Sequence, residues 1–352
     1  MLLSRTRNVR LLGTGLLMGL IAGASAQAAP ANSSPKVLQS WHLDGAGGWD
    51  YLTLDSTAQR LFVSHATRVD VVDTRSGKLV GTIADTNGVH GIALAEDLKR
   101  GYTSNGKADS VTMFDLDTLA VIKEAPVPGH NPDAILYEPV GKHLFTFNGR
   151  SKDVTVLDAA NLTVVATLPV PDKPEFAVDD GKGHIYANIE SEPGQMVVID
   201  SKKLTITATW TLPGCASPSG IAMDKAHGRL FSVCDGKVMA VTDSATGKQI
   251  AKVKVGEGPD AVAYDAQRGL VFSSNGEGTL TVVRQESADH YRVAESVQTK
   301  RGARTMALDS ASGKVYLVSA DFGPLPAATP EQPHPRPVPI PGTFTVLVVG
   351  TP

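Results

Sequence analysis

Three residues near the start of the chain carry side chains that together could hold a divalent metal ion. Asp50, His65 and His90 supply one carboxylate and two imidazoles, and such a set can bind a metal with coordination positions left open for a substrate. A histidine beside Asp133 or Glu175 could instead serve as an acid–base pair. A third interpretation is that these polar groups only line a solvated channel and cap strand ends. The sequence leaves all three interpretations open.

A larger set of polar residues recurs with similar spacing and would surround the same opening. Its members are the candidate ligand-binding residues Asp50, His65, His90, Asn105, Asp133, Asn148, Glu175, Asp260, Asn275 and Arg304. Trp49 and Phe322 could add an aromatic rim. Concave sites with a few convergent polar groups are where proteins usually bind small molecules. We therefore expect a module that binds an unknown small molecule or a periplasmic protein at this opening.

Known catalytic motifs are missing from the sequence. It contains no H-E-x-x-H, no C-x-x-C and no glycine-rich phosphate loop, so no catalytic residue can be assigned from a motif. The alternative to a binding module is a metal-dependent hydrolase or lyase that uses Asp50, His65 and His90. A divalent metal is the one cofactor that these residues suggest.

A pattern that occurs seven times predicts the elements that position these residues. An apolar stretch that ends near an acid, a turn and a Val-rich run recur with spacings of 40 to 45 residues. The equivalent positions are Asp55, Ala95, Glu138, Asp179, Asp224, Asp265 and Asp309. Four short strands per unit at this period are typical of propeller blades. We therefore expect an all-β fold, a seven-bladed β-propeller of four-stranded antiparallel blades.

The innermost strand of each unit alternates large and small side chains, as in Ile92 and Leu94 against Gly91 and Ala93. An alternation with period two indicates a strand whose faces meet different neighbours. Small residues on one face would let the blades approach the propeller axis. Loops that enter the innermost strands lie on the same face of a propeller as loops that leave the second strands. This placement would gather the candidate residues at one channel mouth.

The two ends of the chain are expected to meet in the last blade. The last strand expected in the chain, residues 343–349, is the third strand of that blade, so no fourth, outer strand follows it. Residues 36–43 can supply the outer strand. Such closure would leave no open sheet edge. A proline-rich insertion, residues 321–342, interrupts the same blade. Because proline lacks the N–H that a strand ladder needs, we expect an extended loop there, either a passive surface loop or a docking lid.

The N-terminal segment has the features of a cleaved signal peptide. Three arginines precede a short apolar run and small residues follow it, which is the order in secretory signals. The apolar run is too short to span a membrane. The expected parts are a signal peptide (1–26), a linker (27–34) and the propeller (35–352). We expect a periplasmic monomer with no membrane span.

Charge and cysteine content narrow the class further. The full chain has a net charge of −3, and loss of the three N-terminal arginines makes it more negative. That balance weakens attraction for phosphates, so a nucleic-acid partner is not expected. Cys215 and Cys234 fall on the same face of one blade. Two cysteines in an exported chain favour a disulfide, with a metal or redox pair as the alternative.

Several tetrads of the repeat resemble the YVTN-repeat β-propeller family, and in particular its YncE-like exported members. Residues 102–105 (YTSN), 145–148 (FTFN) and 272–275 (FSSN) carry the resemblance, together with the preceding Gly-x-x-Pro segments. Units one, four, five and seven depart from it, with His65, Ile189, Cys234 and Ser319 at the last tetrad position. The resemblance implies the fold and export. Single-stranded DNA binding is associated with the protein that gives the group its name, and a lactonase-like activity rests on analogy of fold alone.

Overall fold

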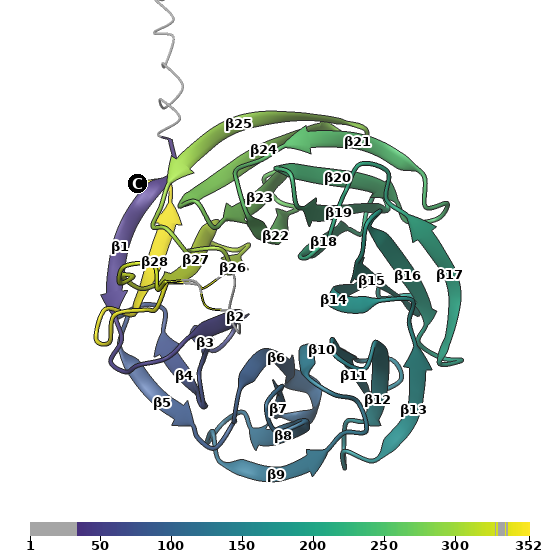
Figure 1. The fold of residues 1–352 in the computed structure, drawn as a ribbon, viewed down its shortest axis with the longest axis horizontal. Helices are drawn as coiled ribbons and strands as arrows, with labels where there is room; N and C mark the ends of the chain where they lie inside the picture. The colour runs from purple at the N-terminus through teal and green to yellow at the C-terminus, as the bar shows by residue number, and fades with distance from the viewer. Residues whose placement is uncertain (1–33, 328, 330–334, 336) are drawn as a thin grey trace, which may run out of the picture. The chain divides into compact units, whose positions relative to one another are not determined.

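The structure is a computed structural model and describes residues 34–327, 329, 335 and 337–352. The expected signal peptide, residues 1–26, lies outside the described residues. The described part of the chain forms seven four-stranded sheets, and every strand pairing in them is antiparallel. Figure 1 shows the sheets arranged as blades in a ring, with one strand of each nearest the centre. The prediction of a seven-bladed all-β propeller is confirmed.

Each blade runs from an inner strand at the centre of the ring to an outer strand at its rim, and the strands follow in that order. Blades one to three contain β2 (Trp49–Asp55), β3 (Arg60–His65), β4 (Arg68–Asp73) and β5 (Leu79–Ile83); β6 (Val89–Ala95), β7 (Arg100–Asn105), β8 (Ser110–Asp115) and β9 (Val121–Pro126); and β10 (Pro132–Glu138), β11 (His143–Asn148), β12 (Asp153–Asp158) and β13 (Val164–Pro169). Blades four and five contain β14 (Lys173–Asp179), β15 (His184–Glu190), β16 (Gln195–Asp200) and β17 (Thr205–Thr211); and β18 (Ile221–Asp224), β19 (Arg229–Cys234), β20 (Val238–Asp243) and β21 (Gln249–Lys254). Blades six and seven contain β22 (Pro259–Asp265), β23 (Leu270–Asn275), β24 (Thr279–Ser287) and β25 (His290–Gln298); and β26 (Met306–Asp309), β27 (Lys314–Ser319), β28 (Thr345–Gly350) and β1 (Lys36–His42). A single 3-10 turn, η1 (Glu96–Leu98), connects β6 to β7 among the described residues.

Burial explains why the middle strands read as continuous apolar runs. In β3 and β8 every residue but one is buried, because both faces of each blade are covered by the neighbouring blades. The outermost strand β17 alternates exposed and partly buried residues, as expected when one face meets solvent. Valine and phenylalanine suit such pleated, covered surfaces.

Aspartates at the end of the third strand form the turns that follow, as their position predicts. Oδ1 of Asp73 accepts hydrogen bonds from the backbone N–H groups of Arg75 and Ser76. Asp158 and Asp243 bond their own turns in the same way. These acids shape turns because a carboxylate can satisfy turn N–H groups that no strand accepts.

Small residues of the inner strands lie where neighbouring blades touch. A Cβ added at Gly220 would lie 2.5 Å from the carbonyl oxygen of Asp260 in the next blade. One added at Gly91 would lie 3.0 Å from the carbonyl oxygen of Asp133. The Gly220 N–H also donates to the Asp260 carbonyl at 2.9 Å. The alternation of large and small residues therefore reflects close packing of the blades around the axis.

The ring closes with the first strand of the chain. β1 pairs antiparallel with β28 and completes the sheet of blade seven. Trp41 and Leu43 are buried in that blade, and the Trp41 ring lies 5.7 Å from that of Tyr316. The predicted N-terminal closure is confirmed.

Two further features fix the blades. Cys215 and Cys234 form a disulfide within blade five, as predicted. The described residues of the proline-rich insertion contain no strand, but the Gly323 N–H donates to the Val338 carbonyl at 2.9 Å. Within the described part of the chain no helix has the length and apolar character of a membrane span.

Candidate functional site

The loops that enter the inner strands of all seven blades meet at one cavity of about 480 Å³. Each blade contributes one polar residue at its entering position, and all seven line the cavity: Asp50, His90, Asp133, Glu175, Ser219, Asp260 and Arg304. The inner strands place them there because β2, β6, β10, β14, β18, β22 and β26 converge on the centre of the ring (Figure 1). The structure thus brings together six of the ten candidate ligand-binding residues.

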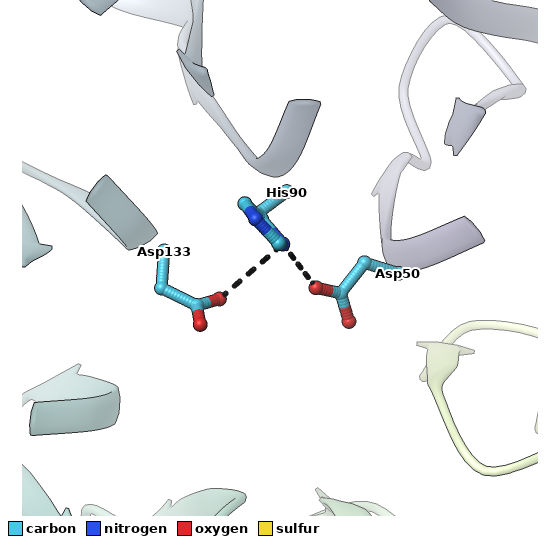
Figure 2. Close-up of side chains that lie close together, drawn as sticks. All are labelled: Asp50, His90 and Asp133. Carbon is cyan, nitrogen blue, oxygen red and sulfur yellow. Dashed lines mark hydrogen bonds and ion pairs between the residues drawn. The ribbon is translucent and has the colours of Figure 1, made fainter. Parts of the chain in front are cut away.

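Asp50, His90 and Asp133 form the tightest cluster in the cavity. His90 Nδ1 lies 2.6 Å from Asp50 Oδ2 and 3.8 Å from Asp133 Oδ1, and Figure 2 shows the imidazole between the two carboxylates. One potential ligand atom from each of the three lies within 4.8 Å of the others. Imidazole nitrogen with carboxylate oxygen is a donor set that suits divalent transition metals.

Two members of the cluster, Asp133 and His90, have pKa values shifted by partial burial and by neighbouring charges. Burial raises the pKa of Asp133 to about 6, and the nearby charge of Asp50 adds to the rise. Burial lowers the pKa of His90, but the hydrogen bond to Asp50 and the charge of Asp133 outweigh it, so the net shift is upward. The two neighbouring acids therefore favour the protonated form of the imidazole.

A second group of charges lies on the blade-four side of the cavity. Lys173 Nζ pairs with both Glu175 and Glu190. Burial raises the pKa of Glu175 to about 9, with Asp133 as the next contributor, although Lys173 opposes the shift. Two carboxyl groups therefore share one lysine on this side of the cavity.

The third group joins blades five, six and seven. Arg304 Nε lies 3.2 Å from Asp260 Oδ2, and Ser219 donates to Asp260 Oδ1 at 2.9 Å. Burial raises the pKa of Asp260, opposed by Arg304. Tyr51 also lines the cavity, and its hydroxyl has no hydrogen-bond partner among the residues that the structure describes.

The remaining candidate residues do not line the cavity, which corrects the expectation for His65. This residue is 1% exposed, its Nδ1 lies 2.8 Å from Asp70 Oδ2, and its ring packs against that of Phe344 with centroids 4.3 Å apart and a tilt of 35°. It ends the second strand of its blade, one strand away from the axis, so it points into the packed blade. The metal-binding set expected as Asp50, His65 and His90 is therefore not assembled, and Asp133 takes the place of His65.

Three asparagines share the placement of His65. Asn105, Asn148 and Asn275 are fully buried, and their amides bind hydroxyl or carboxylate groups near the start of the adjacent third strand. These side chains hold the turn between the second and third strands. The repeat correctly predicts that they end the second strands of their blades. Their side chains, however, face the blade interior instead of the cavity.

Several residues that complete the cavity are not predicted by the repeat. Lys173 and Glu190 lie one position outside its register. Ser104 accepts the Gly91 N–H and donates to the Asp133 carbonyl, and so ties the entering loops of blades two and three. A serine one position before the last tetrad residue, as at Ser64 and Ser274, is the sequence signal that identifies this brace.

Trp49 and Phe322 are neighbours as expected for an aromatic rim, with ring centroids 5.9 Å apart. They line a second pocket of about 350 Å³ beside the central cavity. Arg304 borders both spaces.

Comparison with known proteins agrees with this fold. The chain is similar to a chain of hydrazine synthase from Kuenenia stuttgartiensis, with 17% identity, 78% of this chain and 94% of that chain covered, and a TM-score of 0.69. It is also similar to the WD40 repeats of RRP9, with 11% identity, 90% and 99% covered, and a TM-score of 0.74. At these identities the likeness concerns the fold alone.

A family model matches part of the chain. No curated protein sequence matches the chain significantly. Residues 52–180, which span most of blades one to three and the start of blade four, match a family model described as YNCE-like beta-propeller. The chain is thus a seven-bladed propeller that carries the YNCE-like beta-propeller family signature over residues 52–180.

Proposed function

We propose that the chain is an exported, periplasmic ligand-binding propeller that takes a small cationic molecule into its central cavity. The observation that carries this proposal is the convergence of one polar group from every blade on a single cavity with an excess of acids. Asp50, Asp133, Glu175, Asp260, Glu190 and Asp235 line it against His90, Lys173 and Arg304.

Proton affinities support a cation as the ligand. The pKa values of Asp133, Glu175 and Asp260 are all raised, and in each case burial is the largest cause, followed or accompanied by neighbouring carboxylates. A cation in the cavity would offset this repulsion and favour the charged carboxylates. The unpartnered Tyr51 hydroxyl adds a neutral group that can orient a ligand. Binding at neutral pH should therefore release protons.

A titration with amines tests the proposal. Putrescine is the first probe, and 1,4-butanediol, which has the same length without charge, is its control. We expect putrescine to raise the melting temperature and its calorimetric binding heat to depend on the buffer, because the released protons are taken up by the buffer. Asp133→Asn should abolish binding, whereas Asp117→Asn, at an exposed acid paired with Lys99, should leave it unchanged. Equal effects of amine and diol, or no effect of an amine series, would refute the proposal.

A metal-dependent hydrolase or lyase is a second candidate function, favoured by the geometry of Asp50, His90 and Asp133. A divalent metal there would polarise a carbonyl or activate water, and the neighbouring carboxylates would accept protons. Zn²⁺ and Mn²⁺ binding should be lost in His90→Ala and kept in His130→Ala, which changes an exposed histidine paired with Asp109. Metal bound equally by both variants would exclude this cluster. Metal-dependent hydrolysis of a simple lactone would then distinguish an enzyme from a binding module.

Single-stranded DNA binding receives the least support. The acids that surround the central cavity repel phosphates. Binding to an oligothymidylate that weakens steeply with salt would favour it over the two functions above.

A further inference from the structure

A second pocket lies outside the central cavity and differs from it in chemistry. Its lining comes from the entrance to blade one, two turns of blades six and seven, and the proline-rich insertion: Gly48, Trp49, Gly276, Arg301, Gly302, Arg304, Phe322, Pro337 and Pro339. The central cavity is rich in carboxylates, whereas the described residues that line this pocket include none. A ligand suited to one space is therefore poorly suited to the other.

Aromatic rings form a preorganised apolar wall. The centroid of the Trp49 indole lies 5.3 Å from that of Phe344 and 5.9 Å from that of Phe322. Phe344 is itself buried and packs against the His65 ring. Offset rings at such distances pack favourably. The wall is thus fixed from behind by the core of blades one and seven, so its aromatic surface is held in place before a ligand arrives.

Glycines bring the backbone close to this wall. Gly302 has φ +80°, and a Cβ there would lie 2.7 Å from the Phe322 ring, so the position requires glycine on both counts. A Cβ at Gly48 would meet no atom within 4 Å, which leaves open space beside Trp49. The pocket therefore has room for a flat ring next to the indole.

Two guanidinium groups give the pocket its charge. Within the described residues, the Arg301 side chain has no hydrogen bond or ion pair, and Arg304 pairs only through Nε with Asp260. Asp321, at the start of the insertion, is paired with Lys300 at 3.0 Å. Guanidinium donors match the planar geometry of a carboxylate. Guanidinium N–H groups without acid partners among the described residues, beside an aromatic wall, favour a ligand that is both anionic and flat.

We propose that this pocket is a second binding site that takes a small aromatic carboxylate. The ring of the ligand lies against Trp49 and Phe322, and its carboxylate accepts hydrogen bonds from Arg301 and Arg304. The site shares Arg304 with the proposed cation site, but Trp49 and Arg301 line this pocket alone and not the central cavity.

Tryptophan fluorescence provides the test, with benzoate as the probe and benzyl alcohol as its uncharged control. We expect benzoate to change the emission saturably and benzyl alcohol to bind about tenfold or more weakly, because it lacks the charge-assisted bonds. Arg301→Ala and Arg301→Gln should weaken benzoate binding by a similar factor, while Arg292→Ala, at an exposed arginine paired with Glu286, should not. Trp49→Phe should remove the emission change and leave calorimetric binding in place.

Several outcomes would overturn the proposal. Equal binding of benzoate and benzyl alcohol would show an apolar slot without anion recognition. Unchanged benzoate binding in both Arg301 variants, with unchanged melting temperatures, would place the ligand elsewhere. Binding of oligothymidylate but not of benzoate would identify a nucleic-acid surface. Asp133→Asn should leave benzoate binding intact, so failure at the central cavity and failure at the second pocket can be told apart.

Discussion

Two sets of polar residues at the same end of the blades have opposite surroundings. Residues that enter the inner strands, such as Asp50 and Asp133, keep their carboxylates at the wall of the cavity. Residues that end the second strands, such as Asn105 and Asn148, are fully buried and hydrogen-bonded inside their blades. A side chain at the cavity borders solvent, whereas one at the end of the next strand out from the axis is surrounded by protein.

The difference separates a framework from a site. Asn105 and Asn275 form hydrogen bonds through both the nitrogen and the oxygen of their amides and so stabilise the fold. The cavity carboxylates remain partly uncompensated, which destabilises the fold but leaves them able to bind. We therefore expect substitutions in the first set to lower stability, whereas neutralisation in the second raises it.

The largest effect should come from the strand that completes the framework. Removal of residues 35–44 deletes β1 with Trp41 and Leu43 and exposes an edge of β28. Since loss of one large buried side chain costs about 2–5 kcal/mol, we expect the free energy of unfolding to fall by about 5 kcal/mol or more. Urea denaturation measures it. An unchanged midpoint would show that β1 is not part of the stable framework.

Asn105→Ala should have the next largest effect. Its amide donates to Ser110 and Thr112, and its carbonyl accepts from Thr103. Since each buried group left unpaired costs about 1–3 kcal/mol, we expect a loss of about 3 kcal/mol in chemical denaturation. Asn87→Ala changes an exposed asparagine on the same side of blade two and should have almost no effect. Similar losses of stability in both variants would contradict the prediction that the buried asparagine stabilises the fold more than the exposed one.

Gly220→Ala tests the contact between inner strands. Its Cβ would meet the Asp260 backbone at 2.5 Å, and overpacking of this kind costs about 1–3 kcal/mol. Gly48→Ala adds a Cβ in open space and serves as the matched control. Thermal unfolding should separate the two variants, and equal melting temperatures would mean that the blades can move apart at little cost.

Asp133→Asn should change stability with the opposite sign. Burial raises the pKa of Asp133 to about 6, above its value in the unfolded chain, so the native state loses stability as the pH rises from about 4 to about 6. The amide does not ionise, so the variant should be more stable than the parent at pH 8 and equal to it at pH 4. Denaturation curves at both pH values decide this. A variant less stable at pH 8 would place Asp133 in the framework.

The repeat makes much of this architecture predictable, including the blades, the closing strand and the disulfide. The entering positions are predictable too, because equal register places equivalent residues on equivalent strands. The expectation for His65 is wrong since register locates a residue along a strand but does not say which packed neighbour its side chain meets, which is Asp70 and Phe344 in this blade.

Lys173 escapes prediction for a different reason. The pairing of β14 with β15 contains a register shift, but the first two strands of blades one, two, three and six contain one as well. The shift therefore belongs to the repeat and does not set Lys173 apart. Lys173 lies two residues before Glu175, outside the seven equivalent entering positions, so its place in the cavity depends on the identity of one residue and not on the periodic pattern.

The pairing of β1 with β28, which closes the ring, implies that blade seven folds after the other blades. The two strands are separated by about 300 residues of chain, and contacts so distant in sequence carry a large loop-closure cost and form slowly. The other six blades can form from strands that are neighbours in sequence before β1 pairs with β28. We therefore expect the closing blade to form late and to control the rate at which the ring opens, so that mechanical or thermal unfolding begins where the chain ends meet.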